Sequence, residues 1–134
     1  MTTFRRLLCA ALAAVSLLPG LAAAEPSAIY LVRHGEKLAG QDPALSPQGQ
    51  ARAQHIAAIL RRAGITAIFS TPTVRTQQTA APLAQQTGLA VQPYDPRAPK
   101  ALVEKVRALS GAVVVIGHSN TLPELVTLFG GAPG

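Results

Sequence analysis

Two arginines and two histidines, far apart in the sequence, lie close to the ends of short apolar segments that are typical of buried strands. Arg33, His34 and His118 directly follow such segments, and Arg75 comes a few residues after another one. In a parallel sheet, the carboxyl ends of the strands form one edge, and open α/β sheets bind their ligands there. These positions therefore predict that the four side chains meet in one site.

The chemistry that suits this set is the binding and transfer of a phosphoryl group. A guanidinium can bind two phosphate oxygens with its planar fork. A neutral imidazole can attack phosphorus, and a second imidazole can donate to an equatorial oxygen. Gly35, directly after the first histidine, lets the backbone turn sharply and approach a ligand closely.

The elements that must position these residues alternate along the chain. Expected strands cover residues 28–32, 65–69, 89–94 and 112–116, and expected helices follow them at about 46–63, 73–87, 102–109 and 121–129. This β-α alternation predicts a three-layer α/β/α fold with a mostly parallel sheet. Gly64 is expected to end the first helix and Pro82 to kink the second.

Two details of the helices bear on the site. Arg75 falls in the first turn of its helix, where the helix dipole disfavours a cation, so we expect another group to hold it there. Ser119 and Asn120 are more consistent with a cap on the last helix than with contacts to phosphate. His55 lies opposite the apolar stripe of the first helix and is expected to be a solvated surface residue.

Residues 1–24 have the pattern of a secretory signal peptide. Arg5 and Arg6 precede the apolar run Leu7–Leu18, and small residues at 22–24 offer a cleavage site. The run is shorter than a spanning helix needs, although a membrane anchor is the alternative. We therefore expect a catalytic domain over 25–134 that is exported, to the periplasm or the medium, and is free of the membrane after cleavage.

The net charge of the chain limits the classes of partner that it is expected to bind. The chain of 134 residues has a formal net charge of +6, and residues 25–134 alone carry ten basic and six acidic residues. This balance favours a small anionic ligand. A nucleic-acid partner is poorly supported, because no run of basic residues is present and aromatic residues are few. The oligomeric state stays open.

Four sequence blocks, taken together, resemble the histidine phosphatase superfamily, the phosphoglycerate-mutase-like proteins. The resemblance covers nearly all of residues 25–134. The blocks are Leu31-Val32-Arg33-His34-Gly35-Glu36, Leu45-Ser46-Pro47-Gln48-Gly49, Ser70-Thr71-Pro72 with Arg75-Thr76-Gln77-Gln78-Thr79-Ala80, and Gly117-His118-Ser119-Asn120.

The resemblance implies a phosphatase with a phosphohistidine intermediate. His34 would be the nucleophile, with its other ring nitrogen donating to a backbone carbonyl. Arg33, Arg75 and His118 would bind the transferred phosphoryl group, with Ser119 and Asn120 as further candidate ligands. Water would hydrolyse the intermediate, and neither a metal nor another cofactor would be needed. Thr71 is a candidate for shaping the pocket.

The proton donor for the leaving oxygen is the open question. Asp95 is a candidate general acid, with capping of its loop as the alternative role. Glu36 occupies a position that is usually structural in the family, and Asp42 is expected to lie away from the site. Some short members lack a donor and act on activated substrates such as phosphohistidine.

Other interpretations also remain at this stage. Most relatives continue past the last helix into a further strand, so the C-terminal portion of the fold is expected to be missing and a sheet edge to be exposed. The domain could then be an inactive phosphate- or anion-binding module. A metal site on His34, His118 and Glu36 is disfavoured, because Arg33 and Arg75 would repel a cation.

Overall fold

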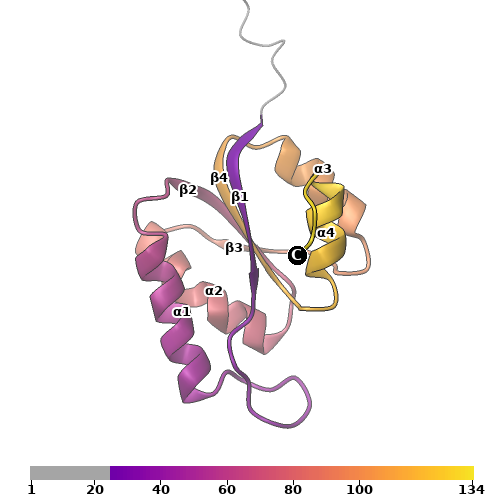
Figure 1. Cartoon of the computed structure of the whole chain (residues 1–134). Coiled ribbons are helices and arrows are strands. Elements are labelled where there is room, and N and C mark those ends of the chain that lie inside the picture. Colours follow the sequence, from indigo (N-terminus) through magenta and orange to yellow (C-terminus); the bar gives the residue numbers. More distant parts are fainter. Residues whose placement is uncertain (1–24) are drawn as a thin grey trace, which may run out of the picture.

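The computed structural model describes residues 25–134. Its four strands, all parallel, form one sheet in the order β1-β4-β2-β3 (Figure 1). The strands are β1 (Pro26–Arg33), β2 (Ile65–Ser70), β3 (Val91–Pro93) and β4 (Gly111–Gly117). The expected signal peptide, residues 1–24, lies outside the described residues.

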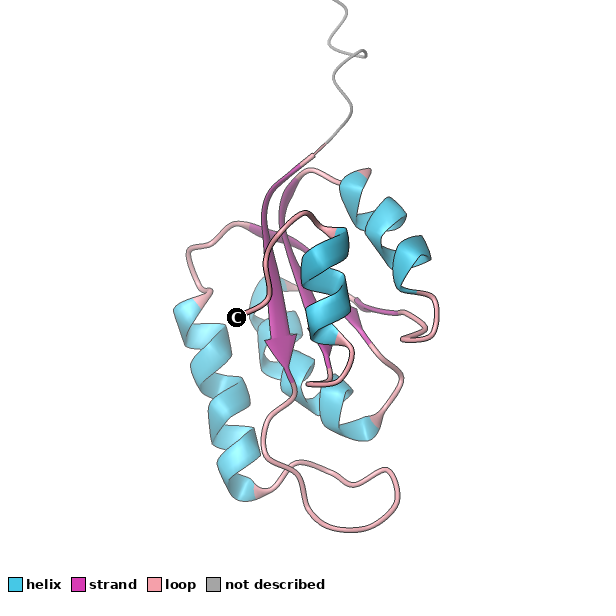
Figure 2. Cartoon of the chain, turned by 45° about the vertical axis from the view of Figure 1, so that its right-hand side comes forward, coloured by secondary structure: helices cyan, strands magenta, loops and turns pink. Residues whose placement is uncertain are grey.

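Helices cover both faces of the sheet (Figure 2). They are α1 (Pro47–Ile59), α2 (Val74–Thr87), α3 (Pro99–Arg107) and α4 (Leu122–Leu128). The helices α1 and α2 pack together on one face, and α3 and α4 pack on the other. The predicted three-layer α/β/α architecture is therefore confirmed.

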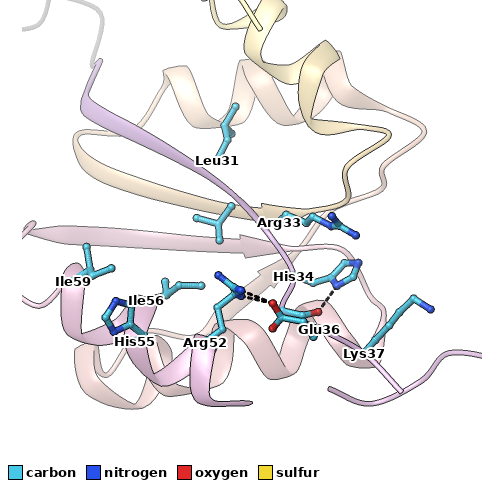
Figure 3. A pocket seen from close by; sticks show the side chains of 11 residues that line it. Leu31, Arg33, His34, Glu36, Lys37, Arg52, His55, Ile56 and Ile59 are labelled. Carbon is cyan, nitrogen blue, oxygen red and sulfur yellow. Dashed lines mark hydrogen bonds and ion pairs between the residues drawn. The ribbon is translucent and has the colours of Figure 1, made fainter. Parts of the chain in front are cut away.

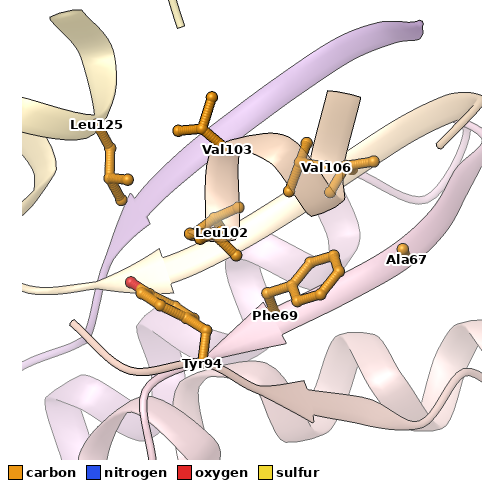
Figure 4. Packing of buried hydrophobic residues seen from close by; sticks show 9 residues of the cluster. Ala67, Phe69, Tyr94, Leu102, Val103, Val106 and Leu125 are labelled. Atoms are coloured by element: carbon orange, nitrogen blue, oxygen red, sulfur yellow. The ribbon is translucent and has the colours of Figure 1, made fainter. Parts of the chain in front are cut away.

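The core is divided in two by the sheet, because side chains alternate along each strand. On the α3–α4 side, Phe69 packs with Leu102 and Val106 (Figure 4). On the α1–α2 side, Ile68 packs with Leu83. The strand β4 contributes buried residues to both clusters, which explains its uninterrupted apolar sequence.

Several element boundaries differ from the sequence predictions. The first helix ends at Ile59 rather than continuing to Gly64, and residue 60 begins a turn that leads into β2. The third strand is shorter than expected, with three residues. By contrast, α2 ends at Thr87 as predicted, with Pro82 inside the helix.

The prediction that Ser119 or Asn120 caps the last helix is wrong. Thr121 is the N-cap residue, and its side chain makes no capping hydrogen bond. The carbonyl oxygen of His118 instead accepts the backbone N–H groups of Thr121 and Leu122, at 3.1 and 3.0 Å. This turn provides the acceptor that a capping side chain would have supplied.

The strand β1 lies at an edge of the sheet. Its only strand neighbour among residues 25–134 is β4, so the backbone groups on its outer side have no strand partner there. In the same part of the chain, no helix is long and apolar enough to cross a membrane.

Candidate active site

His34 directly follows β1, and its ring orientation is fixed by the backbone. Its backbone N–H donates to the carbonyl oxygen of Gly117 at the end of β4, at 3.1 Å. The ring atom Nδ1 lies 2.7 Å from the carbonyl oxygen of Gly35 (Figure 3). Because a carbonyl oxygen only accepts, Nδ1 carries the proton and Nε2 keeps a lone pair. This is the arrangement that the sequence predicted for a nucleophilic histidine.

Gly35 is itself held from two sides. Its N–H donates to Oγ1 of Thr79 in α2, at 3.0 Å, and this hydroxyl donates to the carbonyl oxygen of Arg75, at 2.7 Å. On the other side it packs on the start of α1, where a Cβ at Gly49 would lie only 2.0 Å from the carbonyl oxygen of Glu36. The two glycines therefore let the backbone after His34 lie directly on α1.

His118 follows β4 and faces His34. The ring centroids of the two histidines lie 5.4 Å apart in an edge-to-face arrangement. The Nε2 atom of His118 lies 2.8 Å from Oγ1 of Thr71, and its Nδ1 lies 3.4 Å from Nη2 of Arg75. The second imidazole and one guanidinium are thus in contact, as predicted, at the same edge of the sheet.

Arg75 is held in the first turn of α2 by a residue that the sequence analysis had excluded. Asp42 Oδ1 lies 3.9 Å from Arg75 Nη1 and accepts the backbone N–H of Val74 at 3.0 Å. The expectation that Asp42 lies away from the site is wrong, because loop 38–45 folds back toward α2, with φ of 43° at Asp42 itself. A carboxylate at the helix N-terminus offsets the unfavourable dipole.

The Nε atom of Arg75 is buried and has no hydrogen-bond partner within residues 25–134. A buried guanidinium donor without an acceptor is costly, so its natural partner is a ligand oxygen. Nε and Nη2 together form one side of the guanidinium fork. This side of Arg75 is available to a phosphoryl group.

Arg33 ends β1 with an exposed side chain. Its guanidinium extends to the same side as the His34 ring (Figure 3). Together with Arg75 and His118, it places donors and positive charge around His34, and this convergence was predicted from the position of these residues just past strand ends.

Both imidazoles have a pKa below the ordinary value of 6.5. Burial is the main cause for His34, followed by the charges of Arg75, Arg33 and Lys37, while the hydrogen bond to Gly35 acts in the opposite direction. For His118, burial is followed by the Arg75 charge and by His34. A neutral His34 is therefore favoured at neutral pH, as a nucleophile requires.

A hollow of about 570 Å³ opens beside His34 and extends along the outer edge of β1, between the strand and α1 (Figure 3). Glu36 lies at its border and forms an ion pair with Arg52, which lowers the pKa of the Glu36 carboxyl. His55 lines this hollow and is exposed, as predicted. No cluster of three or more potential metal ligands occurs among residues 25–134.

Asp95 does not line the hollow beside His34. It follows β3 and lines a separate hollow with Thr71 and Tyr94. Its carboxylate accepts hydrogen bonds from the side chain of Arg97, at 3.1 Å, and from the backbone N–H of Arg97, at 2.8 Å. These bonds lower the pKa of Asp95, which is opposite to what a general acid needs.

Fold and site together define an α/β protein with a histidine-based site for phosphoryl groups. Residues 29–97, about half of the chain, match the model of the histidine phosphatase superfamily (branch 1), and the chain belongs to this superfamily.

Comparison with solved structures supports the same fold. The structure described as mycobacterial hydrolase 1 has a TM-score of 0.63 and 18% sequence identity, with 72% of this chain and 75% of that chain covered. The mycobacterial glucosyl-3-phosphoglycerate phosphatase with inorganic phosphate has a TM-score of 0.59 and 19% sequence identity, with 72% of this chain and 75% of that chain covered. The protein histidine phosphatase SixA with tungstate has a TM-score of 0.58 and 19% sequence identity, with 74% of each chain covered. No curated protein matches the chain by sequence.

Proposed function

We propose that the protein hydrolyses phosphomonoesters through a phosphohistidine formed on Nε2 of His34. The observation that carries the proposal is the ring of His34, whose Nδ1 proton is held by the Gly35 carbonyl at 2.7 Å. The free Nε2 lone pair lies in a site that also contains Arg75 and the ring of His118, 5.4 Å away. Membership in the superfamily supports the same reaction.

In this mechanism the phosphoryl oxygens bind to Arg33, Arg75 and His118, and Nε2 of His34 attacks phosphorus. The P–N bond forms as the bond to the leaving oxygen breaks. The guanidinium groups stabilise the negative charge of the transition state. Water then attacks the phosphohistidine, giving inorganic phosphate and restoring the neutral ring of His34.

The test is to replace His34 by alanine and to trap the intermediate. Wild-type protein incubated with labelled aryl phosphate and quenched rapidly should carry an acid-labile, base-stable phosphoryl group. The His34→Ala variant should lose this adduct and all turnover but still bind inorganic phosphate, because the arginines remain. His55→Ala, at an exposed histidine, is the matched control. Substantial turnover by His34→Ala, or trapping of label on another residue, would reject the nucleophile assignment.

A narrower substrate class is supported by the position of Asp95. Within residues 25–134, the carboxylates of Asp95, Glu36 and Asp42 each lie beside an arginine side chain, and we infer that none of them is poised to protonate a poor leaving group. We propose that substrates with good leaving groups, phosphohistidine among them, are hydrolysed fastest. Comparing a phosphohistidine peptide with a sugar phosphate tests it.

We also propose that the enzyme acts outside the cytoplasm. The support is the sequence of residues 1–24, with two arginines, an apolar run and small residues before position 25. Fractionation of cells that express the full chain, with N-terminal sequencing of the product, tests the proposal. A product that keeps residue 1 and stays with the cytoplasm would reject it.

A further inference from the structure

Three threonine hydroxyl groups connect the start of α2 to His118. Thr71 and Thr76 are completely buried, with exposed fractions of 0%. The Oγ1 atom of Thr76 lies 2.9 Å from that of Thr71 and 2.6 Å from that of Thr73. Because each hydroxyl has only one proton, the direction of every bond in this cluster can be worked out.

The direction is set by the two backbone carbonyls beside Thr76. Its Oγ1 lies 2.8 Å from the carbonyl oxygen of Thr71 and 3.0 Å from that of Thr73. Carbonyl oxygens only accept, so the single proton of Thr76 points to these carbonyls, and the hydroxyl of Thr73 must then donate to Thr76 at 2.6 Å. The Thr76 oxygen must therefore accept from the hydroxyl of Thr71, since otherwise two lone pairs would face each other at 2.9 Å.

Thr71 thus donates its only proton to Thr76. Its oxygen then accepts from the atom on its other side, which is Nε2 of His118 at 2.8 Å. Nε2 of His118 therefore carries a hydrogen. An independent contact agrees, because the guanidinium of Arg75 can only donate and lies 3.4 Å from Nδ1 of the same ring. In the free enzyme, His118 is thus neutral, with its lone pair on Nδ1.

We infer that Thr71 is a positioning residue that holds His118 in the Nε2–H form and thereby directs Nδ1 toward the phosphoryl site. Its effect on catalysis rests on the proposed function. A phosphoryl oxygen is an acceptor, and a bare Nδ1 lone pair would repel it. When a phosphoryl dianion binds, His118 must therefore gain one proton at Nδ1, and solvent supplies that proton.

The surrounding charges make this proton uptake depend on the ligand. Arg75 from α2 and His34 from the end of β1 face the ring of His118, and both disfavour a second positive charge. Asp42 lies on the far side of Arg75, and the hydroxyl of Tyr94 bonds to a backbone carbonyl of β4. The negative charge of a bound phosphoryl dianion instead favours a positively charged His118 ring. Arg75 can then turn its donor from Nδ1 to a phosphoryl oxygen.

The experiment is nuclear magnetic resonance of ¹⁵N-histidine-labelled protein, in which two-bond correlations report which ring nitrogen bears a proton. The variants are Thr71→Val, which removes the hydroxyl at nearly constant volume, and Thr71→Ser, which restores it. Thr73→Val is the matched control, because its hydroxyl contacts Thr76 but not His118. Thermal unfolding of each variant verifies that it is folded.

In the wild type, we expect a single Nε2–H form of His118 with a hydrogen-bonded ring proton protected from exchange. Thr71→Val should lose this protected proton and lower the pKa of His118 further, while Thr71→Ser and Thr73→Val keep both. Calorimetry with inorganic phosphate in two buffers should show uptake of one proton per bound phosphate near neutral pH. Affinity of Thr71→Val should fall about tenfold, as for loss of one hydrogen bond to a charged group.

Two results would overturn the inference: an Nδ1–H form of His118 in the wild type, or a folded Thr71→Val variant with an unchanged ring proton and unchanged phosphate binding. Neither depends on turnover. If the tautomer and phosphate binding behave as expected but no phosphohistidine forms, the proposed function fails and the role of Thr71 stands. If turnover occurs through His34 but the tautomer differs, only the inference fails.

Discussion

Arg75 offers the sharpest test of how the site binds phosphoryl groups. Its guanidinium has three nitrogens in three environments: Nη1 lies 3.9 Å from Asp42, Nη2 lies 3.4 Å from His118, and Nε is buried and has no hydrogen-bond partner among residues 25–134. Lysine would keep the positive charge but has one nitrogen at the end of a flexible chain. Arg75→Lys therefore removes the two-point contact without removing the cation.

The expected loss can be worked from these contacts. The side of the fork formed by Nε and Nη2 can give two hydrogen bonds to phosphoryl oxygens, and the lysine ammonium can replace one of them. Loss of one hydrogen bond to a charged group costs about 1.5–3 kcal/mol, or roughly one to two powers of ten. Loss of one transition-state donor in other enzymes is about 10²–10³ in rate. We therefore expect kcat/KM of Arg75→Lys to fall about 10²-fold.

The assay is steady-state hydrolysis of nitrophenyl phosphate with added chelator, together with thermal unfolding to show that the variant is folded. Arg62→Lys is the matched control, because Arg62 is exposed in the turn after α1 and should tolerate the change. A fall of less than threefold for Arg75→Lys would place Arg75 outside the site. An equal fall for Arg62→Lys would show that the effect is not local.

Three further predictions test the acid, the packing and the ionisation of the site. If the ion pair with Arg97 keeps Asp95 in a structural role, Asp95→Asn should slow the hydrolysis of alkyl and aryl phosphates equally and by less than threefold. A loss of about 10²–10⁴-fold confined to alkyl phosphates would instead make Asp95 the general acid. Gly49→Ala should lower the free energy of unfolding in urea by about 1–3 kcal/mol or more, because its Cβ would lie 2.0 Å from a backbone oxygen. Gly134→Ala, with open space around it, should leave the free energy of unfolding unchanged. A Gly49→Ala variant as stable as the wild type would contradict this close packing. The lowered pKa of His118 means that the unfolded chain binds more protons than the folded chain just below pH 6.5, so the contribution of His118 to the free energy of unfolding should fall as pH drops through this window. His118→Gln should weaken this dependence, and a flat profile in the wild type would refute it.

The order of the elements and the meeting of the main site residues could be predicted from the sequence. Apolar strand segments, turn residues and helical periodicity are local signals. Because β1 and β4 are parallel, their carboxyl ends then lie at one edge of the sheet. His34 and His118, 84 positions apart, face each other for this reason. The superfamily predicted from the four blocks was also confirmed.

Contacts that depend on loop conformation could not be predicted in this way. Asp42 reaches α2 only because its own backbone adopts φ of 43° and loop 38–45 folds back. The one signal in the sequence was Asp42 in the loop before Ser46, since a loop carboxylate can accept from the exposed N–H groups at the start of a neighbouring helix. The direction of the threonine hydrogen bonds was equally hidden. It depends on the positions of the backbone carbonyls of Thr71 and Thr73, which precede the first turn of α2.

Residues from all four sequence blocks help to orient the ring of His34. The Gly35 carbonyl directs Nε2 of His34 outward by accepting the Nδ1 proton. That carbonyl keeps its position because Thr79 accepts the N–H of the same residue and Gly49 leaves room for the backbone after it. The strand β4 adds a further restraint, since Gly117 accepts the backbone N–H of His34.

This arrangement separates two kinds of failure in the site. A substitution at Thr79 or Gly49 touches neither substrate nor phosphoryl group, so it should change the orientation of His34 and the rate of phosphohistidine formation while phosphate binding persists. A substitution at Arg75 should weaken both binding and reaction, because its guanidinium faces the phosphoryl group directly. The ratio of phosphate affinity to the rate of phosphohistidine formation therefore distinguishes residues that orient the nucleophile from residues that bind the group it attacks.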